Sequence, residues 1–585
     1  MTATPAHARD HATPHSGRRW WETAVVYQLY VRSFADANND GIGDLAGIRS
    51  RLGYLRDLGV DAIWLNPCYP SPQFDHGYDV ADYFDIEPDY GTLAEFDAFV
   101  AEARQHGIRV MMDVVPNHCS WDHAWFKAAL TAGRGSAERD RFWFRDGLGP
   151  NGDEPPNDWP AIFSGSAWNR VTEPDGTPGQ WYLGLFTPQQ PDLNWHDPDV
   201  NEHFDRMLRF WFDRGVDGFR VDATTVVGKA PGLPDLGPLL ETLGLTDANP
   251  HTTWRPEGHE VWRRWRKLVD AYQLEHPERE LVLIAEAYTA NQPDIFRQYV
   301  NDAEFHSSFS FDLMLAAWST HEVRAAIEDT RAVLTPIGLL PAWTLNNHDA
   351  QRSVTRYGRA DATESTHSTN ALDNSTAAVD LVLGTHRARA AALFELALPG
   401  SVYLYAGEEL GLPEVLDLPD AAREDPVFLR TNGASLGRDG CRVPLPWSTD
   451  ASTNFGFSAP ATTDAAAAGA AGEPWLPQPA SFAALSVAAE DGDEASMLSM
   501  YRSALAVRRT HAALTADDFG WIDAGDLAEQ LLVFRRGDVV VVLNISSTPT
   551  PIATYSGDRR VLLSSLHNHD DPTIAPPSTC LWLAP

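Results

Sequence analysis

The sequence predicts an α/β fold: a closed (β/α)₈ TIM barrel with a small domain inserted after strand three and a C-terminal antiparallel β domain. Two patterns predict the barrel. Apolar runs typical of buried strands alternate with amphipathic stretches typical of helices, and eight such runs occur, the number that closes a barrel. The length of 585 residues predicts the additions, because a barrel alone needs only about 250.

Helical patterns separate the predicted strands. They include 45–59, 92–107 and 385–400, and each ends near a glycine, as helices commonly do. The weakest strand pattern is 305–313. In chain order the predicted strands are 24–34, 60–69, 108–118, 216–222, 281–288, 305–313, 341–349 and 401–410.

Composition divides the rest of the chain. The polar residues 1–17 are predicted to be a disordered N-terminus, and the barrel is assigned to 18–118 and 196–514. Residues 119–195, rich in Trp, Pro, Asp and Gly, are too long for a plain connection and are predicted to form the inserted domain. Alternating apolar runs predict the β domain at 515–585.

Charge and composition exclude several kinds of partner. A net charge of −36 repels nucleic acids and anionic membranes. The sequence contains no apolar run of 18 residues and no signal-peptide pattern, so a cytoplasmic protein is expected. The four cysteines are scattered, which argues against a disulfide framework or a zinc site. We expect a small-molecule substrate, and the oligomeric state stays open.

Charged residues end several of the predicted strands. Arg220 and Asp222 end the fourth, Glu286 the fifth, and His348 and Asp349 the seventh. In such barrels the catalytic groups collect at the carboxyl ends of the strands. Burying three carboxylates together is costly unless chemistry requires them, so these positions predict an active site.

Two carboxyl groups on either side of a bond are the tools of glycoside cleavage. Arg220 precedes Asp222 by two residues and shares its side of the strand, so it is expected to keep Asp222 ionised as a nucleophile. Glu286 follows a strongly apolar run, which favours a protonated carboxyl acting as acid and base. Asp349 is expected to stabilise a positively charged sugar ring.

Five short motifs carry a resemblance to a known family. DVVPNH, GFRVD, IAEA and NNHD resemble the four sequence blocks of glycoside hydrolase family 13, the α-amylase family. QPDLNW (190–195) resembles a fifth block, found in its α-glucosidase and oligo-1,6-glucosidase branch, and the likeness runs from about residue 20 to the end. It implies that Asp222 is the nucleophile, Glu286 the acid/base and Asp349 the third carboxylate. It also implies sugar-binding roles for Asp75, Tyr78, His118, Arg220, His348 and Arg442, the last gripping the terminal glucose.

The stretch DANNDGIGD (36–44) presents closely spaced oxygen atoms. Asp36, Asn38, Asp40 and Asp44, with the carbonyl of Ile42, have a spacing that can wrap a hard cation, although the glutamate that closes an EF-hand is missing. A polar turn of Asx type is the alternative. The resemblance favours a structural Ca²⁺, or Mg²⁺, distant from the chemistry.

Together these features predict a retaining, exo-acting α-glucosidase. We expect it to hydrolyse short α-linked gluco-oligosaccharides of maltose type through a β-glucosyl-enzyme intermediate. Ala223, the residue after the predicted nucleophile, favours α-1,4 linkages, because in relatives a valine there accompanies α-1,6 preference. One alternative is a transglucosylase or isomerase of trehalose synthase or sucrose-active type. Another is a non-catalytic family member, which would lack the carboxylates and carry an N-terminal membrane span.

Overall fold

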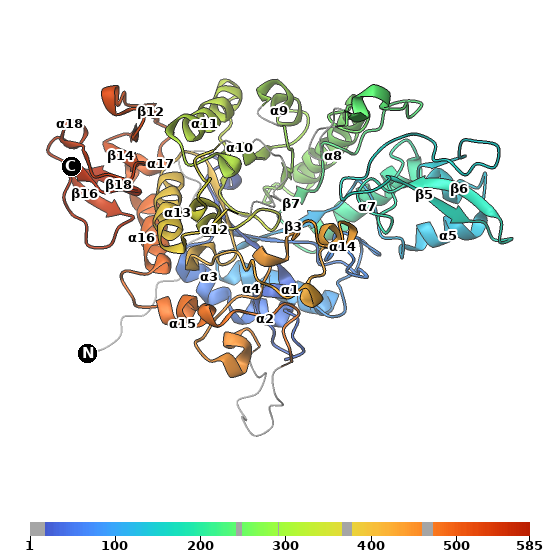
Figure 1. Ribbon diagram of the computed structural model, residues 1–585, viewed down its shortest axis with the longest axis horizontal. Helices are drawn as coiled ribbons and strands as arrows, with labels where there is room; N and C mark the ends of the chain where they lie inside the picture. Colours follow the sequence, from blue (N-terminus) through green and yellow to red (C-terminus); the bar gives the residue numbers. More distant parts are fainter. Residues whose placement is uncertain (1–17, 242–248, 290–291, 365–376, 459–471) are drawn as a thin grey trace.

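The computed structural model describes residues 18–241, 249–289, 292–364, 377–458 and 472–585. The barrel lies in the middle of the molecule (Figure 1). A small unit containing α5 (Ala124–Ala132) and β5 (Trp168–Thr172) projects on one side, and the C-terminal strands lie on the other. The segment 1–17, predicted to be disordered, lies outside the described residues.

Eight parallel strands close into a barrel, which confirms the predicted fold class. The strands are β1 (Val25–Leu29), β2 (Ala62–Leu65), β3 (Arg109–Val114), β7 (Gly218–Val221), β8 (Val282–Ala285), β9 (Ser307–Ser310), β10 (Ala342–Thr344) and β11 (Ser401–Tyr405). Around the barrel they pair in the order β1, β11, β10, β9, β8, β7, β3, β2 and back to β1. The weak 305–313 pattern therefore does form a strand.

Alternation along each strand decides which side chains point into the barrel. In β1, Val25 packs in the outer core with the helices, whereas Val26 packs in a separate cluster of inward-facing strand residues. In β8, Leu283 belongs to the outer core and Ile284 to the inner cluster. The next inward position after Ile284 is Glu286, so the pleat itself directs this carboxyl towards the barrel axis.

Helices follow the strands and cover the outside of the barrel. In chain order they include α2 (Leu45–Ser50), α3 (Leu52–Leu58), α4 (Leu93–Gln105), α7 (Pro198–Asp213), α8 (Pro256–Glu275), α9 (Pro293–Tyr299), α11 (Thr320–Leu334), α13 (Leu381–Leu396) and α16 (Met497–Thr510). Helix α4 begins with a capping box between Thr92 and Glu95. Helix α3 ends at Gly59, whose φ of 107° is the left-handed C-cap that glycine adopts readily.

The chain between β3 and β7 forms the small unit seen in Figure 1. It contains α5, α6 (Ala137–Asp140) and an antiparallel sheet in the order β4 (Phe144–Arg145), β6 (Pro178–Leu183), β5. Its core of tryptophan and leucine side chains also includes Val226, and Ala223 packs against it. The inserted unit therefore rests on the loop that follows β7, beside the carboxyl ends of the strands.

The C-terminal unit is a five-stranded antiparallel sheet. Its order is β12 (Gly520–Trp521), β13 (Leu531–Arg536), β14 (Val539–Asn544), β18 (Thr579–Ala584), β16 (Arg560–Ser564). The indole of Trp582 is fully buried and donates to the carbonyl of Leu393 in α13, at 2.9 Å. This sheet thus packs on a barrel helix and stays away from the carboxyl ends of the strands.

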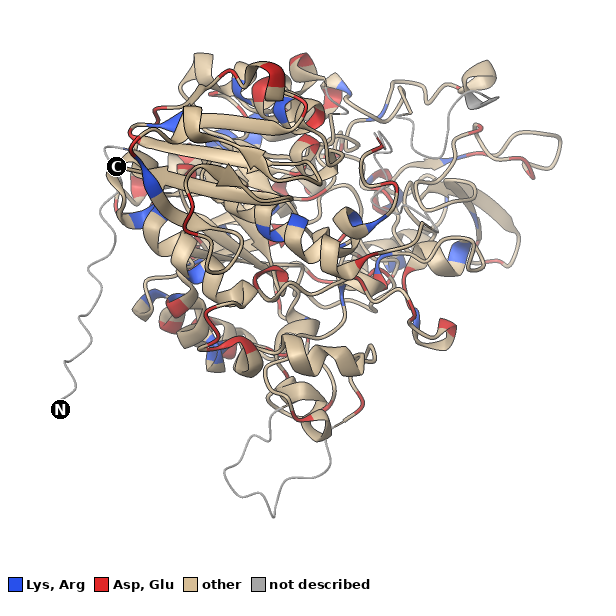
Figure 2. Ribbon diagram, turned by 60° about the vertical axis from the view of Figure 1, so that its left-hand side comes forward, with Lys and Arg blue, Asp and Glu red and all other residues tan. Residues whose placement is uncertain are grey.

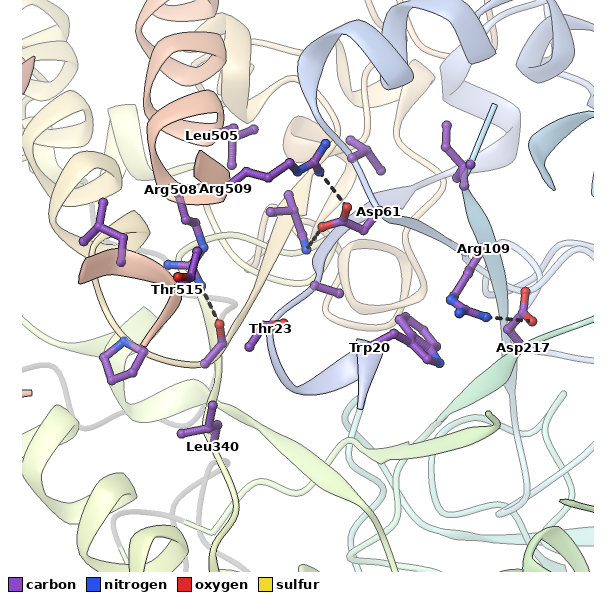
Figure 3. Close-up of a pocket in the computed structure, with 18 of the residues that line it drawn as sticks. Trp20, Thr23, Asp61, Arg109, Asp217, Leu340, Leu505, Arg508, Arg509 and Thr515 are labelled. Carbon is purple, nitrogen blue, oxygen red and sulfur yellow. Dashed lines mark hydrogen bonds and ion pairs between the residues drawn. The ribbon is translucent and has the colours of Figure 1, made fainter. Parts of the chain in front are cut away.

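A cavity of about 260 Å³ lies at the amino end of the barrel, beside the C-terminal unit. Figure 3 shows Asp61 facing Arg509 and Asp217 facing Arg109 in its wall, with Arg508 of α16 nearby. The predicted catalytic residues follow the strands at their opposite ends, so this cavity is separate from the site below.

Charge is spread over the molecule. In the view of Figure 2, acidic positions are numerous and interspersed with basic ones on helices and loops alike. Within the described chain, no helix combines the length and the apolar character needed to cross a membrane.

Candidate active site

The predicted catalytic carboxylates meet at the carboxyl ends of the strands. Asp222 follows β7 directly, Glu286 follows β8, and Asp349 lies in the loop after β10. Asp222 and Glu286 are buried, with 7% and 6% exposure, whereas Asp349 is more accessible. Burial of this kind is expected only where each carboxylate has a charged or hydrogen-bonding partner.

Arg220 is the shared partner of three carboxylates. Its Nη1 lies 2.7 Å from Asp222 Oδ1 and 2.8 Å from Asp113 Oδ1, and its Nη2 lies 2.6 Å from Glu286 Oε1. The residue is 1% exposed. One guanidinium group therefore fixes the predicted nucleophile and the predicted acid/base relative to each other.

Burial and charge compete in this network. Burial raises the pKa of Asp222, the charge of Arg220 opposes the shift, and the neighbouring Glu286 and Asp113 add to it. Burial also raises the pKa of Asp113 to about 7, again against the opposing charge of Arg220. Because several carboxyl groups share one guanidinium, the number of protons that they bind is expected to change with pH near neutrality.

Asp349 sits in a more positive environment. Burial would raise its pKa, but the positive charges of Arg438 and Arg442 hold the pKa of this carboxyl below its usual range. Its Oδ1 lies 2.9 Å from Arg442 Nη2 and 3.0 Å from Arg438 Nη1. Arg438 Nη2 also lies 2.6 Å from Asp75 Oδ1, so this arginine joins two of the predicted sugar-binding carboxylates.

Arg442, predicted to grip the terminal glucose, lies against Asp349. It is fully buried, and besides Asp349 its Nε donates to the carbonyl of His348 at 2.9 Å. Arg438, which is 8% exposed, has Phe163 of the inserted unit stacked against its guanidinium group at 4.9 Å. Of the two arginines, Arg438 is therefore the one that connects Asp75 with Asp349, two carboxylates predicted to face the sugar.

Tyr78 and His348 form a stacked pair beside Arg220. Their rings are 5.2 Å apart and nearly parallel, and Tyr78 Oη lies 2.6 Å from His348 Nε2. Gln28 Nε2, a donor, contacts His348 Nδ1 at 2.7 Å, which leaves Nε2 as the protonated nitrogen. Burial lowers the pKa of His348 well below its usual range, so the ring is neutral. The N–H of this neutral imidazole lies between Tyr78 Oη and Asp349 Oδ2, the latter at 3.2 Å, so the ring orients these two groups beside Arg220.

His118 closes another side of the site. Its Nε2 lies 3.0 Å from the carbonyl of Tyr78, and burial lowers the pKa of His118 to about 3. Gln190 Nε2 donates to Asp75 Oδ2 at 3.0 Å and lies 3.1 Å from His118 Nε2. The structure thus brings His118 and Asp75 together through a residue of the QPDLNW motif.

A buried ion pair anchors the same motif. Lys229 Nζ lies 2.8 Å from Asp192 Oδ2 and 2.9 Å from Asn117 Oδ1. Asp192 also accepts the N–H of Leu185 at 2.8 Å. The loop after β7, the end of β3 and the inserted unit are therefore tied together next to the site.

The predicted metal loop forms a network of its own. Asp36 accepts the backbone N–H groups of Asn39 and Gly41, Asp40 Oδ1 accepts that of Ile42, and Asp44 accepts those of Ala37, Asn38 and Gly47. These are Asx-type contacts. Oxygen is the ligand type that hard cations prefer, and carboxylates engaged in this way retain further lone pairs. In the part of the chain that is described, no group of three or more His, Cys, Asp or Glu is arranged to hold a metal.

Three residues of the network were not predicted. Asp113 occupies an inward position of β3, two residues after Met111 of the inner cluster, so strand alternation was a signal that could have found it. Arg438 shares the motif GRDGCR with Arg442, and spacing alone cannot choose between two arginines four residues apart. Gln190 lies in QPDLNW, where only its contact with Asp75 reveals its role.

A parallel barrel with paired carboxylates at the carboxyl ends of adjacent strands is typical of glycoside-cleaving barrel enzymes. The family described as "Alpha amylase, catalytic domain" matches residues 28–517, and the chain belongs to this family. It is a glycoside hydrolase. A second family, described as "Domain of unknown function (DUF3459)", matches residues 515–582.

Relatives extend over nearly the whole chain. A probable alpha-glucosidase of Rhizobium meliloti (strain 1021) is 35% identical, over 90% of each chain. An oligo-1,6-glucosidase of Parageobacillus thermoglucosidasius is 33% identical, over 92% of each.

Solved structures of similar proteins cover nearly the whole chain as well. The alpha-glucosyl transfer enzyme XgtA superposes with a TM-score of 0.79 at 32% identity, covering 98% of this chain and 99% of that one. The trehalulose synthase MutB from Pseudomonas mesoacidophila MX-45 gives 0.78 at 30% identity, covering 97% of this chain and all of the other.

Proposed function

We propose that this protein is a retaining, exo-acting α-glucosidase. The observation that carries the proposal is the single guanidinium group of Arg220, which contacts Asp222 at 2.7 Å and Glu286 at 2.6 Å. Retaining enzymes hold their two carboxyl groups about 5–5.5 Å apart, and one guanidinium bridging both keeps such a pair close.

The proposed reaction has two steps. Asp222 attacks C1 of the terminal glucose to form a β-glucosyl enzyme, while Glu286 protonates the departing oxygen. Water then attacks C1 with Glu286 as the base, and glucose leaves with its α configuration restored. Asp349, held ionised by the arginines beside it, would stabilise positive charge on the sugar ring.

The exo mode is supported by the bridge across the sugar-binding groups. Arg438 connects Asp75 with Asp349, and Phe163 of the inserted unit packs on it. A connected wall of this kind favours a pocket for one terminal glucose over a groove open at both ends. The α-1,4 preference rests on the small side chain of Ala223, and a methyl or two is worth about ten- to a hundredfold in selectivity.

Glucosyl transfer is the second candidate. It is favoured by the two structural neighbours, which are an alpha-glucosyl transfer enzyme and a trehalulose synthase. Both reactions use the same glucosyl enzyme, and they differ only in whether water or a sugar accepts the glucose.

Product analysis separates these readings. The protein is incubated with maltose, isomaltose, trehalose, sucrose and amylose, and products and kcat/KM are measured. We expect free glucose as the main product, with maltose preferred over isomaltose. Isomaltose as the better substrate would refute the linkage, internal cleavage of amylose would refute the exo mode, and new disaccharides as main products would favour transfer.

We also propose that the 36–44 loop binds one Ca²⁺ or Mg²⁺ that stabilises the fold. Asp36, Asn38, Asp40 and Asp44 and the carbonyl of Ile42 would hold it, as oxygen ligands suited to a hard cation. Chelation should lower the melting temperature, and excess ion should restore it by mass action. An unchanged melting temperature in a metal-free preparation would leave the loop as an Asx turn.

We also propose that the protein is cytoplasmic. It is supported by Cys68, Cys119, Cys441 and Cys580, which are all buried and free of disulfides.

A further inference from the structure

The residue after the proposed nucleophile has an unusual backbone. Ala223 has a φ of 46°, in the left-handed region. A Cβ crowds the following carbonyl oxygen in this region, so non-glycine residues there are uncommon. Such strain persists only where the surroundings enforce it, and it collects at functional sites.

The left-handed turn wraps around Glu286. The N–H of Ala223 donates to Glu286 Oε2 at 2.8 Å. The hydroxyl and N–H of Thr224 both donate to the carbonyl of Glu286, at 2.5 and 3.3 Å. The N–H of Glu286 in turn donates to the carbonyl of Val221 at 2.9 Å. The turn at the end of β7 thus forms hydrogen bonds with both the backbone and the carboxyl group of Glu286.

The two oxygens of Glu286 have different partners. Oε1 contacts Arg220, which is shared with Asp222 and Asp113. Oε2 contacts the amide of Ala223. The chain on both sides of that amide is held, by β7 before it and by the contacts of Thr224 with Glu286 after it. The N–H can therefore keep its contact with Oε2 only while residue 223 stays in the left-handed region, which makes the residue type at this position matter.

We propose that Ala223 is a positioning residue for Glu286, whose left-handed backbone aims its N–H at the carboxyl group that transfers the proton. This inference rests on the proposed function, in which Glu286 is the acid/base. It goes beyond linkage preference, because it predicts that substitutions at 223 change proton transfer to the leaving group itself.

The test compares Ala223→Gly with Ala223→Val. Glycine adopts the left-handed region without strain, whereas a β-branched valine resists it. We measure kcat/KM for maltose, whose leaving group needs a proton, and for 2,4-dinitrophenyl α-glucoside, whose leaving group does not. Ala223→Val should lower the maltose value about 10- to 100-fold and the aryl value less than about threefold. Ala223→Gly keeps the left-handed turn, so it should lower the maltose value less than Ala223→Val does and should leave the ratio of the two values within about threefold of that of the unmodified protein.

Two controls accompany the test. Ser578, in the C-terminal unit, has a φ of 48°, so Ser578→Val introduces the same strain far from the site and should alter the melting temperature without altering the ratio of the two rates. In a Glu286→Gln background, Ala223→Val should add no further change in that ratio, because the group it positions is gone. If Ala223→Val does not fold, Ala223→Leu replaces it.

The outcomes are distinct. Equal losses on both substrates, equal effects of the glycine and valine variants, or an additive effect in the Glu286→Gln background would each overturn the positioning role while leaving the proposed function intact. An unmodified protein that cleaves neither substrate would overturn both.

Discussion

The two ends of the barrel both bury arginines, but they give them different partners. At the carboxyl end, Arg220 contacts three carboxylates, and Arg438 joins Asp75 to Asp349. At the amino end, beside the cavity of Figure 3, Arg508 and Arg536 donate to backbone carbonyl groups. We infer that an arginine shared among carboxylates keeps charged side chains in place for catalysis. An arginine that donates to backbone carbonyls stabilises the folded structure.

Arg508 shows how an arginine at the amino end of the barrel stabilises the fold. Arg508 Nη1 donates to the carbonyls of Leu396 and Leu398 at 2.5 and 2.8 Å, and its Nη2 donates to Gly400. These carbonyls lie at and beyond the end of α13, where the helix leaves acceptors without partners and carries partial negative charge. Burial lowers the pKa of Arg508 to about 10, which still leaves it charged at neutral pH.

The largest expected difference between the two ends of the barrel is between two Asp→Asn changes, one at each end of β7. Asp222→Asn should lower kcat/KM for maltose by at least about three orders of magnitude, because a neutral amide is a poor nucleophile. Asp217→Asn, before the same strand, should change it less than about threefold, since Asp217 serves only structural contacts such as the N–H of Val110. Retained activity in Asp222→Asn would refute its assignment as nucleophile.

The next prediction concerns the two arginines of the GRDGCR motif. Arg438→Lys should weaken substrate binding, raising KM for maltose about 10- to 100-fold, because a lysine cannot span Asp75 and Asp349 as a guanidinium does. Arg442→Lys should raise KM less than about tenfold, since its second contact is a backbone carbonyl. Steady-state kinetics and melting temperatures are measured for both variants.

If Arg442→Lys raised KM more than Arg438→Lys, this result would support the expectation drawn from the sequence, that Arg442 grips the terminal glucose. Equal effects on KM, with equal falls in melting temperature, would mean that neither arginine has a specific role in binding.

The sequence was sufficient for the barrel because strand and helix patterns are local. All eight predicted runs contain a barrel strand, and the polar residues at their ends meet as expected. It was insufficient for Arg438, because the choice between two arginines depends on contacts with Asp75, which lies 363 residues away in the chain. The left-handed backbone of Ala223 could not be predicted from the sequence either, because alanine normally adopts a negative φ.

The smallest expected effect on activity belongs to the amino end. Arg508→Met should leave kcat/KM within about twofold, because its contacts are far from the carboxylates, yet lower the free energy of unfolding by about 2–4 kcal/mol. The reason is that it leaves the carbonyls of Leu396, Leu398 and Gly400 without their donor. Denaturant unfolding and steady-state kinetics are measured on the same preparations.

The neighbouring Arg509 supplies the matched control on the same helix and at the same cavity. It is about one-third exposed, pairs with Asp61 at 2.6 Å and donates to one carbonyl, that of Gly59, at 2.7 Å, where Arg508 donates to three. Arg509→Met should therefore cost less, at most about 1–2 kcal/mol. Equal destabilisation by the two variants would show that burial against carbonyls adds nothing to Arg508. A large loss of kcat/KM in Arg508→Met with unchanged stability would refute the division of labour, because the amino end would then act on the chemistry at the other end of the barrel.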